Sequence, residues 1–154
     1  MSEFIYRLGV ILYGFALGLS ERFSDKASKM IKGRRNIWVE ISTSMQTVKG
    51  PVVWVHCASL GEFEQGRPFI EEIKDKYSNI KIVVTFFSAS GYEVRKKYPK
   101  ADAVFYLPFD TRRNAEKFIS AINPVFACFV KYEFWHFYLK ALKQRNIPVV
   151  SISS

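Results

Sequence analysis

Three short polar segments hold the residues of this chain that are best suited to chemistry, and each follows an apolar run. The first is Ala58-Ser59-Leu60-Gly61-Glu62, in which Gly61 would permit a tight turn into a helix that starts near Glu62. A carboxylate there can act as a general base toward a substrate hydroxyl. It can equally complement the positive end of the helix dipole, so on position alone both interpretations of Glu62 stay open.

The second segment, residues 86–92, brings together hydroxyl groups and a glycine, Gly91. The hydroxyls of Ser88 and Ser90, with backbone N–H groups at a helix start, could bind an anion. The simpler interpretation is that one of the serines caps the helix, and Ser90 with Glu93 three residues later resembles a capping box.

The third segment presents a cation, a carboxylate and an imidazole, namely Lys131, Glu133 and His136. The sequence contains two cysteines and two histidines, and their spacing fits no zinc site, so we expect no metal. A nucleophile–base pair of Ser59 and His136 would lack the G-x-S-x-G elbow. The glycine-rich spacing and the lysine of a phosphate loop are also missing from the first segment.

The elements that must position these segments alternate between strand and helix. Five short runs are almost continuously apolar and rich in β-branched and aromatic residues, which is typical of parallel strands covered on both faces. Helical spacing fills the intervals, so we predict an α/β fold with an open, Rossmann-like parallel sheet and flanking helices. Ligands of such sheets bind beyond the carboxyl ends of the strands, where all three segments fall. The predicted strands are 52–57, 80–85, 103–107, 125–130 and 149–152.

Several helix boundaries also follow from the sequence. Asp110 or Thr111 can cap the third helix between the strands. The fourth is expected over residues 133–145 with Phe134 among its inward-facing residues. Residues 36–51 are interpreted as a connector, with a short helix as one option.

Composition narrows the possible partners. The 154 residues suffice for one domain with a real core, and the net charge of +9 suits nucleic acid, an anionic membrane or a phosphorylated substrate. We expect no nucleic-acid partner, because neither an RNA-binding signature nor zinc-finger spacing is present. Cys57 and Cys128 stand inside apolar runs and are interpreted as buried residues of a reducing compartment.

The amino terminus combines an apolar run with a basic trailer. Residues 8–20 carry no charge and, as a run, are too short to span a bilayer comfortably. Cations follow, which fits a helix lying on or dipping into an anionic leaflet from the cytoplasmic side. The alternative is a buried helix packed on the domain. We therefore predict a membrane-associating helical segment over residues 1–35 and a Rossmann-like domain over residues 36–154. The cations are Lys26, Lys29, Lys32, Arg34 and Arg35.

Taken together, four segments resemble one family, the 3-deoxy-D-manno-octulosonic acid (Kdo) transferases of lipopolysaccharide synthesis. The segments are VHCASLGEFEQGRPFIEEIK, TFFSASGYEVRKKYP, DAVFYLPFDTRRNAEKFI and NPVFACFVKYEFWHFYLKALKQRNIPVVSIS. The resemblance implies the amino-terminal, acceptor-side half of a GT-B glycosyltransferase on the cytoplasmic face of the cell inner membrane. Such an enzyme moves Kdo from CMP-Kdo to a lipid A precursor, with inversion and without metal or cofactor. It also implies a carboxyl-terminal domain for the donor, which these residues do not include.

The resemblance also implies roles for individual residues. Glu62 matches the catalytic base, and acceptor binding falls to the loops that hold Ser59, Gly61, Ser88, Ser90 and Gly91. Lys131, Glu133 and Trp135 fall on the family's E-x-E-x-W-P pattern, from which this chain departs twice. Lys131 replaces the first carboxylate and His136 replaces the proline. A lysine can stabilise developing charge but cannot replace a base, so a transition-state role for Lys131 is in doubt.

A different class of protein remains as the alternative. A non-catalytic, membrane-associated α/β module could use its lysines and arginines to hold a phosphorylated ligand. The coding sequence beyond Ser154 would separate the two interpretations, because only the enzyme requires a second βα domain.

Overall fold

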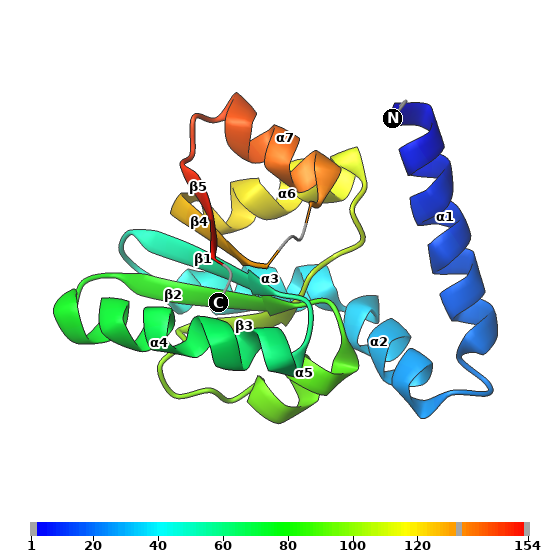
Figure 1. Cartoon of the computed structure of the whole chain (residues 1–154), viewed down its shortest axis with the longest axis horizontal. Coiled ribbons are helices and arrows are strands. Elements are labelled where there is room, and N and C mark those ends of the chain that lie inside the picture. The colour runs from blue at the N-terminus through cyan, green and yellow to red at the C-terminus, as the bar shows by residue number, and fades with distance from the viewer. Residues whose placement is uncertain (1–2, 132–133, 153–154) are drawn as a thin grey trace.

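The sheet at the centre of the molecule is parallel throughout. The computed structural model describes residues 3–131 and 134–152. Its five strands are ordered β3-β2-β1-β4-β5, which confirms the predicted α/β architecture (Figure 1). The strands are β1 Val52–Cys57, β2 Lys81–Phe86, β3 Ala103–Tyr106, β4 Pro124–Val130 and β5 Val149–Ile152.

The central strand β1 is buried along its whole length because helices cover both faces of the sheet. On one face, Trp54 of β1 packs with Phe118 and Tyr138 from two helices. On the other face, Val55 belongs to a second core that includes Phe63. Two covered faces explain why the strands are apolar without alternation.

Seven helices are present in the described part of the chain. Helices α4 and α5 pack on one side of the sheet, while α3, α6 and α7 contribute to the core on the other side (Figure 1). The helices are α1 Glu3–Ser20, α2 Asp25–Arg35, α3 Ile37–Thr47, α4 Leu60–Lys76, α5 Ala89–Arg95, α6 Arg112–Ile122 and α7 His136–Gln144.

Some helix starts differ from those expected. Ser88, not Ser90, caps α5, and Ser90 lies inside that helix. Thr111 caps α6, whereas Asp110 accepts hydrogen bonds from the first turn of α7. Phe134 was expected to face inward but precedes α7 and is 72% exposed. For α5 and α6 the local pattern offered two neighbouring candidates for the cap, and in each helix one of the two is the cap.

Helix α1 stands along one side of the molecule and contacts α2 (Figure 1). It is long and apolar enough to cross a membrane by length and composition alone, and none of its residues is buried. Large apolar side chains are therefore presented outward. They include Phe4, Ile5, Ile11, Leu12, Phe15 and Leu19.

Helix α2 packs on the α/β domain through its carboxyl-terminal half. A Cβ atom at Gly33 would lie 2.2 Å from the ring of Tyr106, so only glycine permits this approach. Arg34 is buried and donates hydrogen bonds to the carbonyls of Leu107 and Phe87. Its guanidinium also lies 4.7–5.0 Å from three aromatic centroids, in cation–π geometry.

Arg34 was counted among the cations that face the membrane, and that prediction is wrong. Burial lowers the pKa of Arg34 to about 10, so the group is still a cation at neutral pH. Its charge is nevertheless directed at carbonyls and rings inside the domain. The remaining cations of the trailer are exposed, and two of them form salt bridges, Lys29 with Asp25 and Arg35 with Glu21. Lys26 and Lys32 are the other two.

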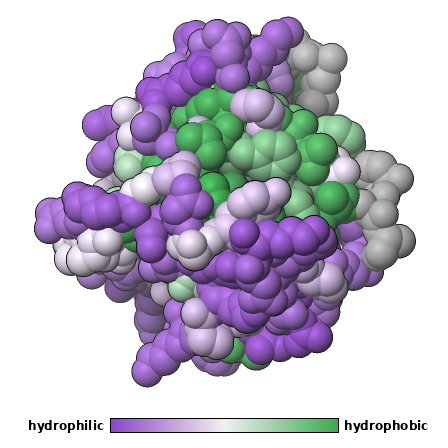
Figure 2. Space-filling view, turned by 90° about the vertical axis from the view of Figure 1, so that its left-hand side faces the viewer, coloured by the Kyte–Doolittle hydropathy of each residue, from purple (hydrophilic) through white to green (hydrophobic). Residues whose placement is uncertain are grey.

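Strand β5 forms one edge of the sheet. Val149 and Val150 of this strand are 41% and 40% exposed. Figure 2 looks onto the left-hand side of Figure 1 and shows an apolar area bordered by hydrophilic residues on this side.

Candidate functional site

The three loops expected to carry chemistry converge at the carboxyl ends of the strands. The N–H of Ser88 donates to the carbonyl of Ala58 over 2.9 Å, which joins the loops after β2 and β1. The indole of Trp135, in the segment after β4, lies 4.7 Å from the ring of Phe87 and 5.7 Å from His56. The sheet thus brings distant segments of the sequence to one edge.

Ser59 caps α4, and the side chain of Glu62 reaches back to the residue before this cap. The backbone N–H of Ala58 donates to Glu62 Oε2 over 2.5 Å, and the N–H of Glu62 donates to Ser59 Oγ over 3.4 Å. The arrangement resembles a capping box, which a serine followed three residues later by glutamate favours, except that the donor to the glutamate is Ala58 in place of Ser59. The spacing of Ser59 and Glu62 was present in the sequence, where Glu62 was interpreted as a partner of the helix dipole or as a general base.

Besides the bond from Ala58, the carboxylate of Glu62 can accept further hydrogen bonds or a proton. An ionised carboxylate offers about four lone-pair sites on its two oxygen atoms. Glu62 is partly exposed at the loop, and one of its oxygens is oriented by a backbone N–H. The geometry therefore fits both interpretations of Glu62, as a helix cap and as a positioned base.

The two glycines of the candidate site differ in their surroundings. Gly61 lies inside α4, and Gly50 is the only glycine with positive φ in the described part of the chain, so the tight-turn explanation of Gly61 is wrong. A Cβ atom at Gly61 would have only Ser59 Oγ, at 4.0 Å, as a neighbour. At Gly91 a Cβ atom would lie 2.2 Å from the ring of Phe86, so this glycine allows α5 to pack closely on β2. Contact of either glycine with an acceptor stays a prediction.

The hydroxyls of the second loop interact with each other. Ser88 Oγ lies 2.6 Å from Ser90 Oγ and accepts the N–H of Ser90 over 3.2 Å. These bonds support capping, the simpler of the two interpretations. Anion or acceptor binding by Ser88 and Ser90 stays a prediction.

The third loop begins with a sharp change of direction after β4. Lys131 is exposed and has a φ of 64°, in the left-handed region. Its N–H donates to the carbonyl of Ile152, and its carbonyl accepts from Ser151 Oγ. Glu133, the other predicted catalytic residue of this loop, lies outside the described residues.

His136 begins α7 and is not positioned as a metal ligand. Its Nε2 lies 3.9 Å from Glu3 Oε2, and its ring lies 5.4 Å from that of Tyr6. Within residues 3–131 and 134–152, no group of three histidine, cysteine or acidic side chains could hold a metal ion.

Asp110 was one of two candidate caps for α6, but its carboxylate accepts hydrogen bonds from α7 and α1. It is 1% exposed, and its carboxylate accepts from the Tyr6 hydroxyl at 2.5 Å and from the N–H groups of Phe137 and Tyr138 at 3.2 Å. Burial raises the pKa of Asp110 above its ordinary value, although these three bonds oppose the shift. No residue next to α7 in the sequence indicates this capping interaction, because α6 and β4 lie between Asp110 and α7.

A buried polar group also lies beneath the loops. His56 Nδ1 lies 2.9 Å from Thr85 Oγ1, which accepts the indole N–H of Trp54. Burial lowers the pKa of His56 to about 3, so the imidazole is neutral at physiological pH. Its Nε2 and the Nε1 of Trp135 are buried and form no hydrogen bond within the described structure.

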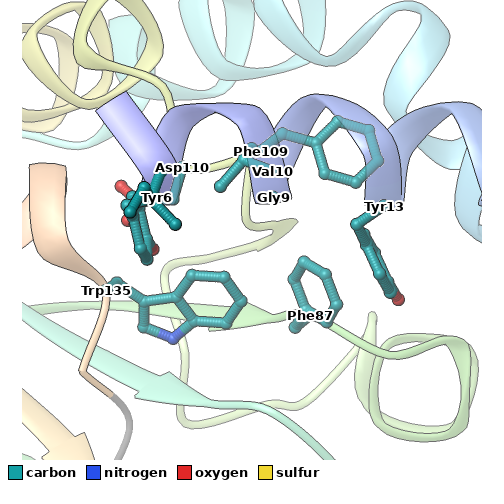
Figure 3. A pocket seen from close by; sticks show the side chains of 9 residues that line it. Tyr6, Gly9, Val10, Tyr13, Phe87, Phe109, Asp110 and Trp135 are labelled. Carbon is teal, nitrogen blue, oxygen red and sulfur yellow. The ribbon is translucent and has the colours of Figure 1, made fainter. Parts of the chain in front are cut away.

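An apolar pocket of about 470 Å³ opens between α1 and the loops after β2, β3 and β4. Tyr6, Gly9 and Tyr13 of α1 form one wall, and Phe87 and Trp135 lie opposite (Figure 3). Figure 3 shows the two tyrosines pointing from α1 toward the loops. Sequence reasoning missed this pocket because it separated the amino-terminal helix from the domain.

Comparisons with known proteins agree with the resemblance seen in the sequence. A family model described as 3-deoxy-D-manno-octulosonic-acid transferase (kdotransferase) matches residues 19–154. The 3-deoxy-D-manno-octulosonic acid transferase of Haemophilus influenzae is 32% identical over 100 residues, which cover 64% of this chain and 23% of that protein. The enzyme of the same name from Aquifex aeolicus is 33% identical over 93 residues, or 60% of this chain and 25% of that protein.

The two relatives match more than half of this chain but only part of their own length. The chain spans about a quarter of the length of the curated relatives it matches. The family model, in contrast, includes everything from the end of α1 to the last residue. On that match, the chain belongs to the 3-deoxy-D-manno-octulosonic-acid transferase family.

Proposed function

We propose that this chain is the acceptor-binding half of a glycosyltransferase that moves Kdo from CMP-Kdo to a lipid A precursor. The observation that carries the proposal is the position of Glu62 in a chain of this family. Glu62 follows the central strand, at the edge where the loops after β1, β2 and β4 meet. That edge is where open parallel sheets bind their ligands.

In the proposed reaction Glu62 is the general base. Its carboxylate takes the proton from an acceptor hydroxyl while that oxygen forms a bond to the anomeric carbon of Kdo. The bond between that carbon and the phosphate oxygen breaks, and CMP leaves as an anion. Attack opposite to the leaving group inverts the anomeric centre, and neither a metal nor a cofactor takes part.

The surrounding residues have supporting roles in this proposal. The N–H of Ala58 holds Oε2 of Glu62, which leaves Oε1 as the atom that would accept the proton. Ser59, Gly61 and the second loop with Ser88, Ser90 and Gly91 would contact the acceptor. Lys131 is exposed and could stabilise negative charge, while Glu133 would retain the second carboxylate of the family pattern.

The proposed partners follow from the same assignment. A second, carboxyl-terminal domain would hold most of CMP-Kdo, and no nucleic acid would take part. The exposed apolar side chains of α1, with Lys26 and Lys32 close behind them in the sequence, favour an anionic membrane surface. We place the protein at the cytoplasmic face of the cell inner membrane.

The experiment is a transfer assay on the protein encoded by the complete gene. With CMP-Kdo labelled in the sugar and an acylated, phosphorylated glucosamine disaccharide as acceptor, labelled lipid should form. The chain of 154 residues alone should form no product, because most donor contacts would be missing. A complete protein that binds the acceptor without forming product would favour the non-catalytic module, and product from the chain alone would refute the two-domain assignment.

A further inference from the structure

The pocket beside α1 is built from carbon-rich surfaces. Val10 and the aromatic rings of Tyr13, Phe87 and Phe109 line it, and its volume of about 470 Å³ lies within the range of small-ligand sites. Trp135 presents carbon atoms to this space, since its indole nitrogen points away from α1 (Figure 3). Such a lining favours an apolar ligand.

Two polar groups at the pocket, the carboxylate of Asp110 and the hydroxyl of Tyr6, are already engaged with each other. Asp110 is the one charged residue of the lining, and its carboxylate accepts from Tyr6 and from two backbone N–H groups of α7. A polar ligand would have to break these bonds, whereas a hydrocarbon chain would leave them intact. The hydrogen bonding therefore favours an apolar group over a sugar or a nucleotide in the pocket.

The pocket lies between helix α1, which we propose contacts the membrane, and a loop that is bonded to the loop of Glu62. One wall is α1, on which several large apolar side chains outside the pocket lining are exposed. The opposite wall includes Phe87, and the next residue, Ser88, is bonded to the loop of Glu62. Arg112 and Arg113 are exposed in the first turn of α6, just after Asp110 in the sequence, and they offer positive charge to anionic groups. An amphiphile with a hydrocarbon tail and phosphates matches this combination.

We infer that the pocket holds one fatty acyl chain of the lipid acceptor. The assignment rests on the proposed function for the identity of the acceptor, but the apolar site itself does not. Helix α1 is then a wall of the acceptor site in addition to a membrane-facing element. The acyl chain fixes the distance between the membrane and the sugar that meets Glu62.

Glycine residues of α1 offer a matched pair of variants. Gly9 lines the pocket, and a Cβ atom there would have no atom within 4 Å, so Gly9→Leu adds a side chain in open space. Gly18 has equally open surroundings in the same helix but does not line the pocket. Gly18→Leu therefore changes helix propensity and apolarity in the same way without filling the site.

The first measurement is photolabelling of the complete protein with myristic acid that carries a diazirine in its tail. Label is expected on Val10, Phe87 or Trp135. Gly9→Leu should reduce it by about tenfold, the loss expected when roughly two buried methylene groups are displaced, while Gly18→Leu should not. Equal labelling of both variants would overturn the inference, whatever the transfer activity. Labelling without any sugar transfer would contradict the proposed function and leave the acyl site standing.

The second measurement distinguishes the acceptor from bulk lipid. The acylated disaccharide should displace the label at lower concentration than phosphatidylglycerol vesicles do. In the transfer assay, Gly9→Leu should raise KM for this acceptor by about tenfold with kcat almost unchanged, because uniform binding is lost. More effective displacement by phosphatidylglycerol, or an unchanged KM, would refute the assignment to the acceptor.

Discussion

At the residue scale, the proposed catalytic role and the capping role would use different oxygens of Glu62. Oε2 is held by the N–H of Ala58, and we propose Oε1 for proton abstraction. A carboxylate fixed by its own helix start needs little reorientation when a substrate hydroxyl arrives, which favours a general base. The same bond makes Glu62 part of the stability of α4.

The glycines of the site provide a test of local packing. Gly61→Ala should raise the free energy of unfolding by up to about 1 kcal/mol, because a methyl group fits there and alanine favours the helix. Gly91→Ala should lower it by about 1–3 kcal/mol, because the methyl group would overlap Phe86. Urea denaturation measures both values. Destabilisation by Gly61→Ala would mean that this backbone has a constraint not visible in its surroundings.

His56 predicts a loss of stability in mild acid. The unfolded chain binds a proton at this residue below a pH of about 6.5, whereas burial keeps the folded imidazole neutral down to a pKa of about 3. The unfolded state therefore binds more protons between these values, and stability falls with falling pH. Between about pH 7 and about pH 5 the loss from this residue is ~2 kcal/mol.

Denaturation curves across that range, compared with those of His56→Leu, isolate this contribution. The variant should be less stable at neutral pH but should lack this part of the pH dependence. His136→Gln, at an exposed histidine, serves as the control and should keep the wild-type dependence. An unchanged dependence in His56→Leu would contradict the assignment.

At the element scale, Asp110 connects three helices. It immediately precedes the cap of α6, accepts from the first turn of α7, and binds Tyr6 of α1. Asp110→Ala should lower the free energy of unfolding by about 2–3 kcal/mol, because a helix cap is lost and buried donors are left unpaired. Tyr6→Phe removes only one of these bonds and should cost about 1 kcal/mol. Equal losses in the two variants, measured by denaturation, would contradict this account.

Some elements of the fold could be predicted from the sequence, and others could not. The strands of the sheet were predictable within about one residue, because continuous apolar runs are specific to strands covered on both faces. The cap of α7 and the burial of Arg34 were not predictable, since their partners lie far away in the sequence. For the candidate site, the three loops followed from the strand ends, but the pocket depends on how α1 packs, which no local pattern contains.

At the scale of the whole molecule, charge and apolar surface are combined at the amino-terminal end. Lys26→Gln with Lys32→Gln should weaken binding to phosphatidylglycerol vesicles by about 30-fold at low salt, because each lysine near an anionic surface contributes about 1 kcal/mol. Both lysines are exposed, so the fold should not change. Cosedimentation with vesicles measures the effect.

The control for this prediction lies on α7. Lys143 is exposed there, and Lys143→Gln changes the net charge without altering the basic trailer. It should leave vesicle binding almost unchanged. Equal weakening by the control would show that total charge, rather than a surface beside α1, governs association with the membrane.

The central claim is the role of Glu62, and its most direct test is Glu62→Gln in the complete protein. Glutamine can still accept the N–H of Ala58, so thermal unfolding should match that of the wild type. Transfer of Kdo should fall by about 10²–10⁴-fold, the usual contribution of a general base. Glu64→Gln changes another carboxylate of α4, one that is paired with Arg67 of α4 and Arg95 of α5, and it should retain activity. Normal turnover by a folded Glu62→Gln protein would contradict the account.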